Sequence, residues 1–287
     1  MPRKTVLDLQ KMKTGNPQKE IAPQKITMVT AYDYTMARLI DKTDIDMVLV
    51  GDSVGMVFQG HPDTLRVTLD QMIYHAQAVH RGLSKAHLTV DMPFMSYQVS
   101  IEQAIQNAGR LMQEGCAQSV KIEGYHPKII NKLVSIGIPV VAHLGLTPQS
   151  VHALGGYKVQ GKEDEAQQKM IEQATELAEA GAFALVVEMI PASLAKKITE
   201  ILSIPTIGIG AGPHCDGQVL VCNDLLGMNM AFTPKFLKRY ASLEEGIVDA
   251  LHNYQHEVVE GIFPDQKHSF GTISKQDTET TIQLYGT

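Results

Sequence analysis

The sequence predicts an α/β protein that folds as a single-domain (β/α)8 TIM-type barrel. From residue 26 onward, short apolar runs alternate with amphipathic segments, which is typical of parallel strands connected by helices. The apolar runs are nearly continuous, as expected for strands buried on both faces. Five of them end on an ionisable residue, and active sites lie at the carboxyl ends of such strands. The length of 287 residues fits one barrel of about 250 residues.

Seven apolar runs are predicted to be strands, and the segments between them are predicted to be helices. The strands comprise residues 26–30, 47–51, 87–91, 118–123, 139–143, 183–188 and 205–210. Thr68 with Gln71, and Ser100 with Gln103, have the spacing of a capping box at a helix start. Pro191 is suited to open a further helix, because proline is favoured in the first helical turn.

The last part of the barrel is the hardest to assign. Residues 216–226 could be helix or strand; we expect a helix there and a short eighth strand near 235–239. Residues 245–260 are predicted to be the closing helix. The barrel domain, with a short N-terminal helix, is thus expected to span 1–262. Residues 263–287 are expected to form a polar, extended or partly disordered tail.

Composition excludes several classes of function. With 25 basic and 31 acidic residues the net charge is -6, which argues against non-specific binding of nucleic acid. No apolar run approaches the ~18 residues that a membrane span needs, so no membrane partner is expected. The N-terminus has no apolar segment typical of a secretory signal. The three cysteines have no metal-ligand or redox spacing, and a cytoplasmic location is expected.

The ionisable strand ends are the candidate active site. They are Asp52, Asp91, Glu123, His143 and Glu188. Because the carboxyl ends of parallel strands meet at one rim, these side chains are expected to converge. Four carboxylates and one imidazole at one rim indicate a metal site with an acid–base group beside it.

Asp52 and Asp91 are predicted to hold a divalent cation. Mg²⁺ prefers oxygen ligands and is often bound by one or two carboxylates together with water and substrate oxygens. The alternative is that each aspartate only caps the turn or helix that follows its strand. Glu123, at the next strand end, is expected to be a further metal ligand.

Lys121 and Glu123 are two residues apart in one strand, so their side chains share a face. They could form a structural ion pair. Alternatively, Glu123 contacts the metal or its water, and Lys121 binds a substrate carboxylate or carbonyl. Buried lysines also lose their charge readily, so Lys121 could form a Schiff base.

Glu188 has no basic partner evident in the sequence, which suits a general base that faces the substrate. The alternative is a capping role ahead of the helix at Pro191. His143 could donate a hydrogen bond to substrate or only satisfy a backbone carbonyl. The glycine-rich segment 155–162 could form a mobile loop over the site.

Several longer motifs together resemble the ketopantoate hydroxymethyltransferase family. They are TAYDY (30–34), VGDSVGMVFQGHPDTL (50–65), DMPFMSY (91–97), VKIEG (120–124), HLGLTPQS (143–150), GGYKVQG (155–161), IGIGAG (207–212) and PKF (234–236). The resemblance runs from about residue 5 to 270. It implies a barrel of the phosphoenolpyruvate mutase/isocitrate lyase superfamily. The tail after residue 270 has no counterpart in the family pattern.

The resemblance also implies an activity and a role for each site residue. The substrate would be 3-methyl-2-oxobutanoate, and 5,10-methylenetetrahydrofolate would donate the one-carbon unit. Asp52 and Asp91 would be direct Mg²⁺ ligands beside the bound oxoacid, with Glu123 close by or acting through water. Ser53 and Lys121 would bind the oxoacid, and Glu188 would be the base. The protein would be a homo-oligomer, a decamer built from two pentamers.

Two other functions are compatible with a barrel of this kind. A C–C or C–P lyase of the same superfamily would be expected to carry a catalytic Cys or His on a mobile loop, but residues 124–128 read GYHPK and contain no Cys. A non-catalytic oxoacid-binding barrel would not need a base such as Glu188. The sequence therefore favours the hydroxymethyl transfer over both alternatives.

Overall fold

Eight parallel strands close into a barrel in the computed structural model, which describes residues 3–15, 20–230 and 233–271. The strands follow each other around the ring in chain order, and β8 pairs with β1. They are β1 (Ile26–Thr30), β2 (Met47–Val50), β3 (His87–Asp91), β4 (Ser119–Glu123), β5 (Val140–Gly145), β6 (Ala184–Glu188), β7 (Thr206–Ile209) and β8 (Gly217–Leu220). The predicted (β/α)8 fold is confirmed.

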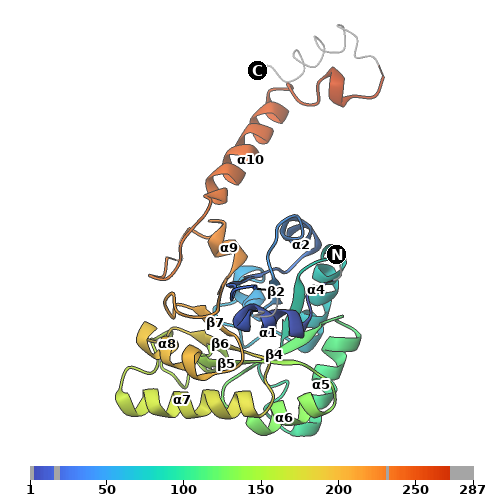
Figure 1. Ribbon diagram of the computed structural model, residues 1–287. Helices are drawn as coiled ribbons and strands as arrows, with labels where there is room; N and C mark the ends of the chain where they lie inside the picture. Colours follow the sequence, from blue (N-terminus) through green and yellow to red (C-terminus); the bar gives the residue numbers. More distant parts are fainter. Residues whose placement is uncertain (1–2, 16–19, 231–232, 272–287) are drawn as a thin grey trace.

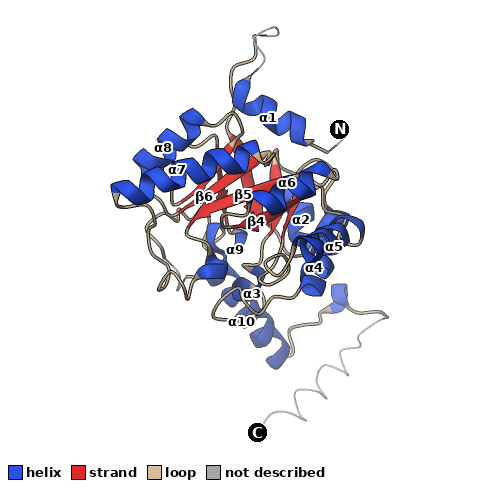
Figure 2. Cartoon of the chain, turned by 90° about the horizontal axis from the view of Figure 1, so that it is seen from below, coloured by secondary structure: helices blue, strands red, loops and turns tan. Residues whose placement is uncertain are grey.

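Helices surround the strands, as Figure 2 shows. They are α1 (Val6–Thr14), α2 (Tyr34–Ile40), α3 (Val54–Val57), α4 (Leu69–Gly82), α5 (Ile101–Gln113), α6 (Pro127–Ser135), α7 (Asp164–Glu179), α8 (Ala192–Ile201), α9 (Cys222–Leu225) and α10 (Leu243–Val259). The capping box at Thr68 is formed. At Ser100 only half of it forms, because the Gln103 side chain accepts from the Val99 N–H instead of the Ser100 N–H.

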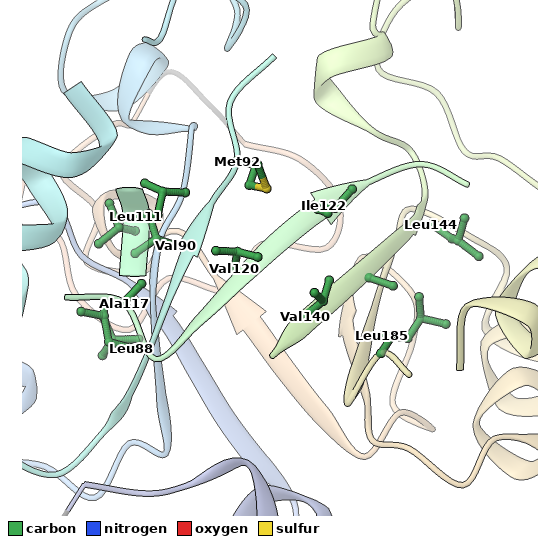
Figure 3. Close-up of a cluster of buried hydrophobic side chains, with 14 of the residues drawn as sticks. Leu88, Val90, Met92, Leu111, Ala117, Val120, Ile122, Val140, Leu144 and Leu185 are labelled. Atoms are coloured by element: carbon green, nitrogen blue, oxygen red, sulfur yellow. The ribbon is translucent and has the colours of Figure 1, made fainter. Parts of the chain in front are cut away.

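Strand alternation divides the apolar side chains into two clusters. One lies between the strands and the helices; Val90, Val120 and Leu185 belong to it (Figure 3). The other lies inside the barrel, where Met28 and Val186 pack with Leu9 of α1. Leu9 is only 1% exposed, which shows that α1 covers the amino end of the barrel. The interior is therefore a packed core and not a channel.

The C-terminal part differs from the sequence prediction at two places. Residues 217–220 form β8 and only 222–225 form a helix, α9, so the expected helix over 216–226 was wrong for its first part. The strand predicted near 235–239 is absent, so that prediction was wrong. The cause is the short 210–216 connection, which joins β7 to β8 without a helix between them. The predicted helix at 245–260 does form as α10, but it does not close the barrel.

The α10 helix extends away from the barrel (Figure 1). None of its residues is buried against the described part of the chain. Of the predicted tail, residues 263–271 are described and contain a short 3-10 turn at Gln266–His268. Residues 272–287 lie outside the described residues. Within the described ranges, no helix is long and apolar enough to cross a membrane.

Candidate active site

The five predicted strand-end residues all lie at the carboxyl rim of the barrel, as expected. Asp52, Asp91, Glu123 and His143 are buried, and the side chain of Glu188 is 16% exposed. Strand register makes neighbours of the polar residues, because Asp91 pairs with Lys121 and Glu123 pairs with His143. The fold therefore brings the predicted residues of β2 to β6 into one site.

Lys121 lies between two carboxylates. Its Nζ is 3.1 Å from Asp91 Oδ1 and 3.4 Å from Glu123 Oε1. Burial would lower the pKa of Lys121, but the neighbouring carboxylates outweigh that effect and raise it above its usual value. The shared face of Lys121 and Glu123 is thus confirmed. An ammonium held this firmly is not suited to Schiff-base chemistry, which needs the neutral amine.

Gly51 allows the turn after β2 to approach β3 closely. The backbone N–H of Asp52 donates to Asp91 Oδ2 at 3.1 Å. A Cβ atom on Gly51 would lie 2.8 Å from Ser53 Oγ and 3.5 Å from Asp91 Oδ2. The Tyr32 hydroxyl lies 2.9 Å from Ser53 Oγ. This hydrogen bond restrains the Ser53 hydroxyl, which is predicted to bind substrate. Any larger residue at 51 would displace Ser53.

The pKa values of Asp52, Asp91 and Glu123 are shifted in different directions. Burial, and then repulsion by Glu123 and Asp91, raise the pKa of Asp52 well above its usual value. Burial also raises the pKa of Asp91, although Lys121 opposes this. Burial acts in the same direction on Glu123, but Lys121 and His143 lower its pKa to about 2. The raised pKa values mean that Asp52 and Asp91 favour their neutral forms in this site, and a cation beside them would favour the charged forms.

The donor set fits a hard divalent cation with two protein ligands. Asp91 Oδ1 is buried and, apart from its ion pair with Lys121, accepts no hydrogen bond within the described chain. Both Glu123 oxygens are engaged, Oε1 by Lys121 and His143 and Oε2 by the Gln149 N–H at 3.0 Å. In the described ranges, no three His, Cys, Asp or Glu side chains form a group that could hold a metal. Mg²⁺ does not require three, because it commonly takes one or two carboxylates plus substrate and water.

His143 lies between the two glutamates of the rim. Its Nδ1 is 3.5 Å from Glu123 Oε1 and its Nε2 is 3.3 Å from Glu188 Oε2, the latter without hydrogen-bond geometry. Burial and Lys121 lower the pKa of His143, but the two glutamates raise it to about 9. Glu188 therefore has the basic partner that was not evident in the sequence. The residue after it, Met189, has a left-handed φ of 45°, which is uncommon without glycine and occurs often near active sites.

Gln149 and Tyr97 are part of the site but were not identified from sequence. The Gln149 amide donates to Asp52 Oδ2 at 2.8 Å and accepts from the Tyr97 hydroxyl at 2.7 Å. Both side chains are buried. Both lie in motifs that carry the family resemblance, DMPFMSY (91–97) and HLGLTPQS (143–150), but the motifs alone do not indicate a role for either residue.

The mouth of the site is bordered by the 155–162 segment. Tyr157 reaches from this segment to α3, where its hydroxyl lies 3.6 Å from Met56 Sδ. Burial, and then Asp63 and Glu188, raise the pKa of Tyr157, so its hydroxyl lies within the field of the site. A cavity of about 510 Å³ adjoins Met56. It is lined by Met56, Val57, Asn223, Met228, Asn229 and Glu244.

A closed (β/α)8 barrel with a buried carboxylate–lysine cluster at the carboxyl ends of its strands defines the chain as a barrel enzyme. A sequence model of the ketopantoate hydroxymethyltransferase family matches residues 3–266. The chain therefore belongs to the ketopantoate hydroxymethyltransferase family.

Curated relatives share more than half of their residues with this chain. A 3-methyl-2-oxobutanoate hydroxymethyltransferase of Syntrophotalea carbinolica is 56% identical over 270 residues, which are 93% of this chain and 98% of the relative. The enzyme of the same name from Geobacter metallireducens is 53% identical with the same coverage.

Solved structures support the fold. A phosphonopyruvate hydrolase has a TM-score of 0.60 at 10% identity, and covers 100% of this chain and 95% of its own. A 2,3-dimethylmalate lyase, described as a member of the PEP mutase/isocitrate lyase superfamily, has a TM-score of 0.57 at 13% identity. It covers 98% of this chain and 99% of its own. At these identities the likenesses support the barrel fold alone.

Proposed function

We propose that this protein transfers a hydroxymethyl group from 5,10-methylenetetrahydrofolate to 3-methyl-2-oxobutanoate, giving 2-dehydropantoate for pantothenate biosynthesis. Membership of the family and relatives at 53–56% identity support this activity. Water supplies the hydroxyl oxygen, and tetrahydrofolate is the second product. The observation that carries the proposal is Lys121, buried among carboxylates, with Glu188 on the same rim.

The side chains of the rim divide the chemistry between them. Lys121 and Ser53 bind the oxoacid carboxylate and orient C3 toward Glu188. Glu188 removes the C3 proton as general base, and the resulting enolate carbon bonds to the methylene carbon of the folate as one of the two C–N bonds of that carbon breaks. The released nitrogen takes up the proton from Glu188. Water then displaces the second nitrogen, which is protonated in turn as tetrahydrofolate leaves. His143, in contact with Glu188, restrains the orientation of the base. The cavity beside Met56 offers room for the folate next to the oxoacid.

Mg²⁺ is the metal that the donor set favours, held by Asp52 and Asp91 with Glu123 at the edge of the site. When bound, it would supply Lewis-acid stabilisation of the negative charge that develops on the oxo group. Two observations support this part of the proposal. Asp52, Asp91 and Glu123 are buried close enough to repel one another, and Asp91 Oδ1 accepts no hydrogen bond within the described chain besides its ion pair with Lys121.

Proton exchange tests the proposed mechanism directly. The protein is incubated with Mg²⁺ and 3-methyl-2-oxobutanoate in D₂O, without folate, and the C3 proton is followed by NMR. We expect exchange by the wild type and none above background by Glu188→Gln. No exchange by the wild type would contradict enolisation. Exchange that persists in the variant would contradict only the role of Glu188. Borohydride should not trap Lys121, because an ammonium does not form an imine.

We also propose that the protein is a cytoplasmic homo-oligomer, with the decamer of the family as the expected form. The α10 helix supports this, because it exposes one stripe of apolar residues: Leu243, Ile247, Leu251, Tyr254 and Val258. A second copy of the chain could cover this stripe. Light scattering of the wild type and of Leu251→Glu tests the proposal, with a smaller assembly expected for the variant. The free state of the three cysteines agrees with a reducing compartment.

A further inference from the structure

Gln149 connects the strand ends that carry the carboxylates. It lies in the 3-10 turn Pro148–Ser150 that follows β5, and it is 5% exposed. Its backbone N–H donates to Glu123 Oε2 at 3.0 Å, and its side-chain amide donates to Asp52 Oδ2 at 2.8 Å. One residue therefore contacts acids from both β2 and β4.

The orientation of the Gln149 amide is determined by its surroundings. Nε2 also donates to the Met92 carbonyl at 2.9 Å, and a carbonyl can only accept. Oε1 accepts from the Tyr97 hydroxyl at 2.7 Å and from Gln98 Nε2 at 3.2 Å. All four hydrogen-bonding positions of the amide are thus used. An exchange of N and O would place the amide oxygen, an acceptor, against Asp52 Oδ2 and the Met92 carbonyl, which are acceptors too, so the donor side must face Asp52.

Asp52 depends on this amide more than the other two acids do. Lys121 forms ion pairs with Asp91 and Glu123. Among the described residues, the Asp52 carboxylate receives its hydrogen bond from Gln149 alone. This donor is neutral, so it restrains the carboxylate without neutralising the charge that a cation requires. Hydrogen bonds to ligating carboxylates from such outer residues commonly control metal affinity.

We propose that Gln149 is a positioning residue that holds the Asp52 carboxylate for a divalent cation, and that Tyr97 holds Gln149 in turn. This inference rests on the proposed function, since it assumes the cation at Asp52 and Asp91. The hydrogen bonds run from Tyr97 in the loop after β3, through Gln149 in the turn after β5, to Asp52 at the end of β2.

Binding of Mn²⁺ without substrate tests the inference independently of activity. Free Mn²⁺ is counted by electron paramagnetic resonance during titration of the purified full-length protein. Gln149→Met keeps the size of the side chain and removes both donors, and its Kd should rise roughly 10- to 100-fold. Gln98→Met is the matched control, because it removes a donor to the same amide oxygen without contact to Asp52. Its Kd should stay within about 2-fold of wild type.

Tyr97→Phe provides a second, milder variant. Its Kd should rise less than that of Gln149→Met. The Tyr97 hydroxyl also contacts the backbone of Glu123, at 3.0 Å to its carbonyl and 3.2 Å from its N–H. In the double variant the two effects should be less than additive, because Gln149→Met already removes the contact between Tyr97 and the Gln149 amide. Thermal unfolding of each variant shows whether that variant is folded. If Gln149→Met does not fold, Tyr97→Phe decides the question alone.

The outcomes separate this inference from the proposed function. Wild-type affinity in folded Gln149→Met, or in Tyr97→Phe where only that variant folds, would overturn the positioning role. If Asp52→Asn loses Mn²⁺ at the same time, the metal site itself stands and only the positioning role fails. A wild type that binds no Mn²⁺ would overturn both.

Discussion

The two ends of the barrel differ in how their charged side chains are paired. At the amino end two acids each have their own cation: Lys4 pairs with Asp46, and Lys13 pairs with Asp216. The same acids accept further bonds from strand residues, as when Asp216 accepts from the Thr206 N–H at 2.9 Å. At the carboxyl end, Lys121 forms ion pairs with both Asp91 and Glu123, and the Asp52 carboxylate accepts its hydrogen bond from the neutral Gln149.

This difference shows how to separate structural from functional charge in one fold. A matched and fully hydrogen-bonded pair holds two segments together, here α1 and the barrel. A surplus of one sign in a buried site destabilises the protein unless a ligand compensates, and such sites bind or react. We therefore expect substitutions at the amino end to change stability, and substitutions at the carboxyl end to change activity.

The largest effect is expected for Glu188→Gln at the carboxyl end. Removal of a general base typically costs 10²- to 10⁴-fold in rate, so kcat for 2-dehydropantoate formation should fall in that range. The unfolding midpoint should change little, because the side chain keeps its size. More than a tenth of wild-type kcat in this variant would contradict the proposed division between the ends.

Leu9→Ala at the amino end should lower stability by about 2–5 kcal/mol, because it leaves a cavity in the barrel interior. Urea unfolding followed by circular dichroism measures this loss. Leu7→Ala is the matched control in the same helix, since Leu7 is 64% exposed; its effect should stay within about 0.5 kcal/mol. For both folded variants kcat should equal that of wild type, and a loss of kcat in folded Leu9→Ala would break the comparison.

His87, near the amino end of β3, should make stability depend on pH. Its ring contacts the Lys4 carbonyl at 3.0 Å and Ser119 Oγ at 2.9 Å, and burial lowers its pKa to about 4. An unfolded histidine has a pKa near 6.5, so between these values the unfolded state binds more protons. Stability should therefore be lost as pH falls from about 6.5 toward 4.

The size of the His87 effect follows from this difference in pKa. Acidification from pH 7 to 5 should cost the wild type about 2 kcal/mol more than it costs His87→Gln. Denaturant titrations of both proteins at the two pH values measure it. Equal pH slopes for the two proteins would show that another group controls the acid sensitivity.

The smallest effect is expected for Lys13→Met, which removes one cation from a matched pair. Because the pair is partly exposed and Asp216 keeps its bonds to Thr206, the loss should be about 1 kcal/mol. The exposed Lys11→Met in the same helix is the control and should be close to neutral. A loss of kcat in Lys13→Met would mean that the amino end also affects the reaction.

Sequence alone predicted most of the barrel and the rim residues. Seven strands and the position of Asp52, Asp91, Glu123, His143 and Glu188 follow from local patterns, since a buried parallel strand is continuous in its apolar character. The eighth strand was missed because the preceding connection has no helix. Gln149 was not identified because its role depends on a contact with Asp52, which is 97 residues away in the chain.

The hydrogen bond between Gln149 and Asp52 joins residues that are synthesised at different times. A chain is synthesised from its N-terminus, so β2 to β4 with Asp52, Asp91, Lys121 and Glu123 emerge before the turn that restrains them. A partly folded intermediate that lacks β5 would carry the acids without Gln149, His143 or Glu188. The first half of the barrel would then contain unrestrained acids, and the protein would gain its reactive geometry only at the late, long-range step that docks the second half.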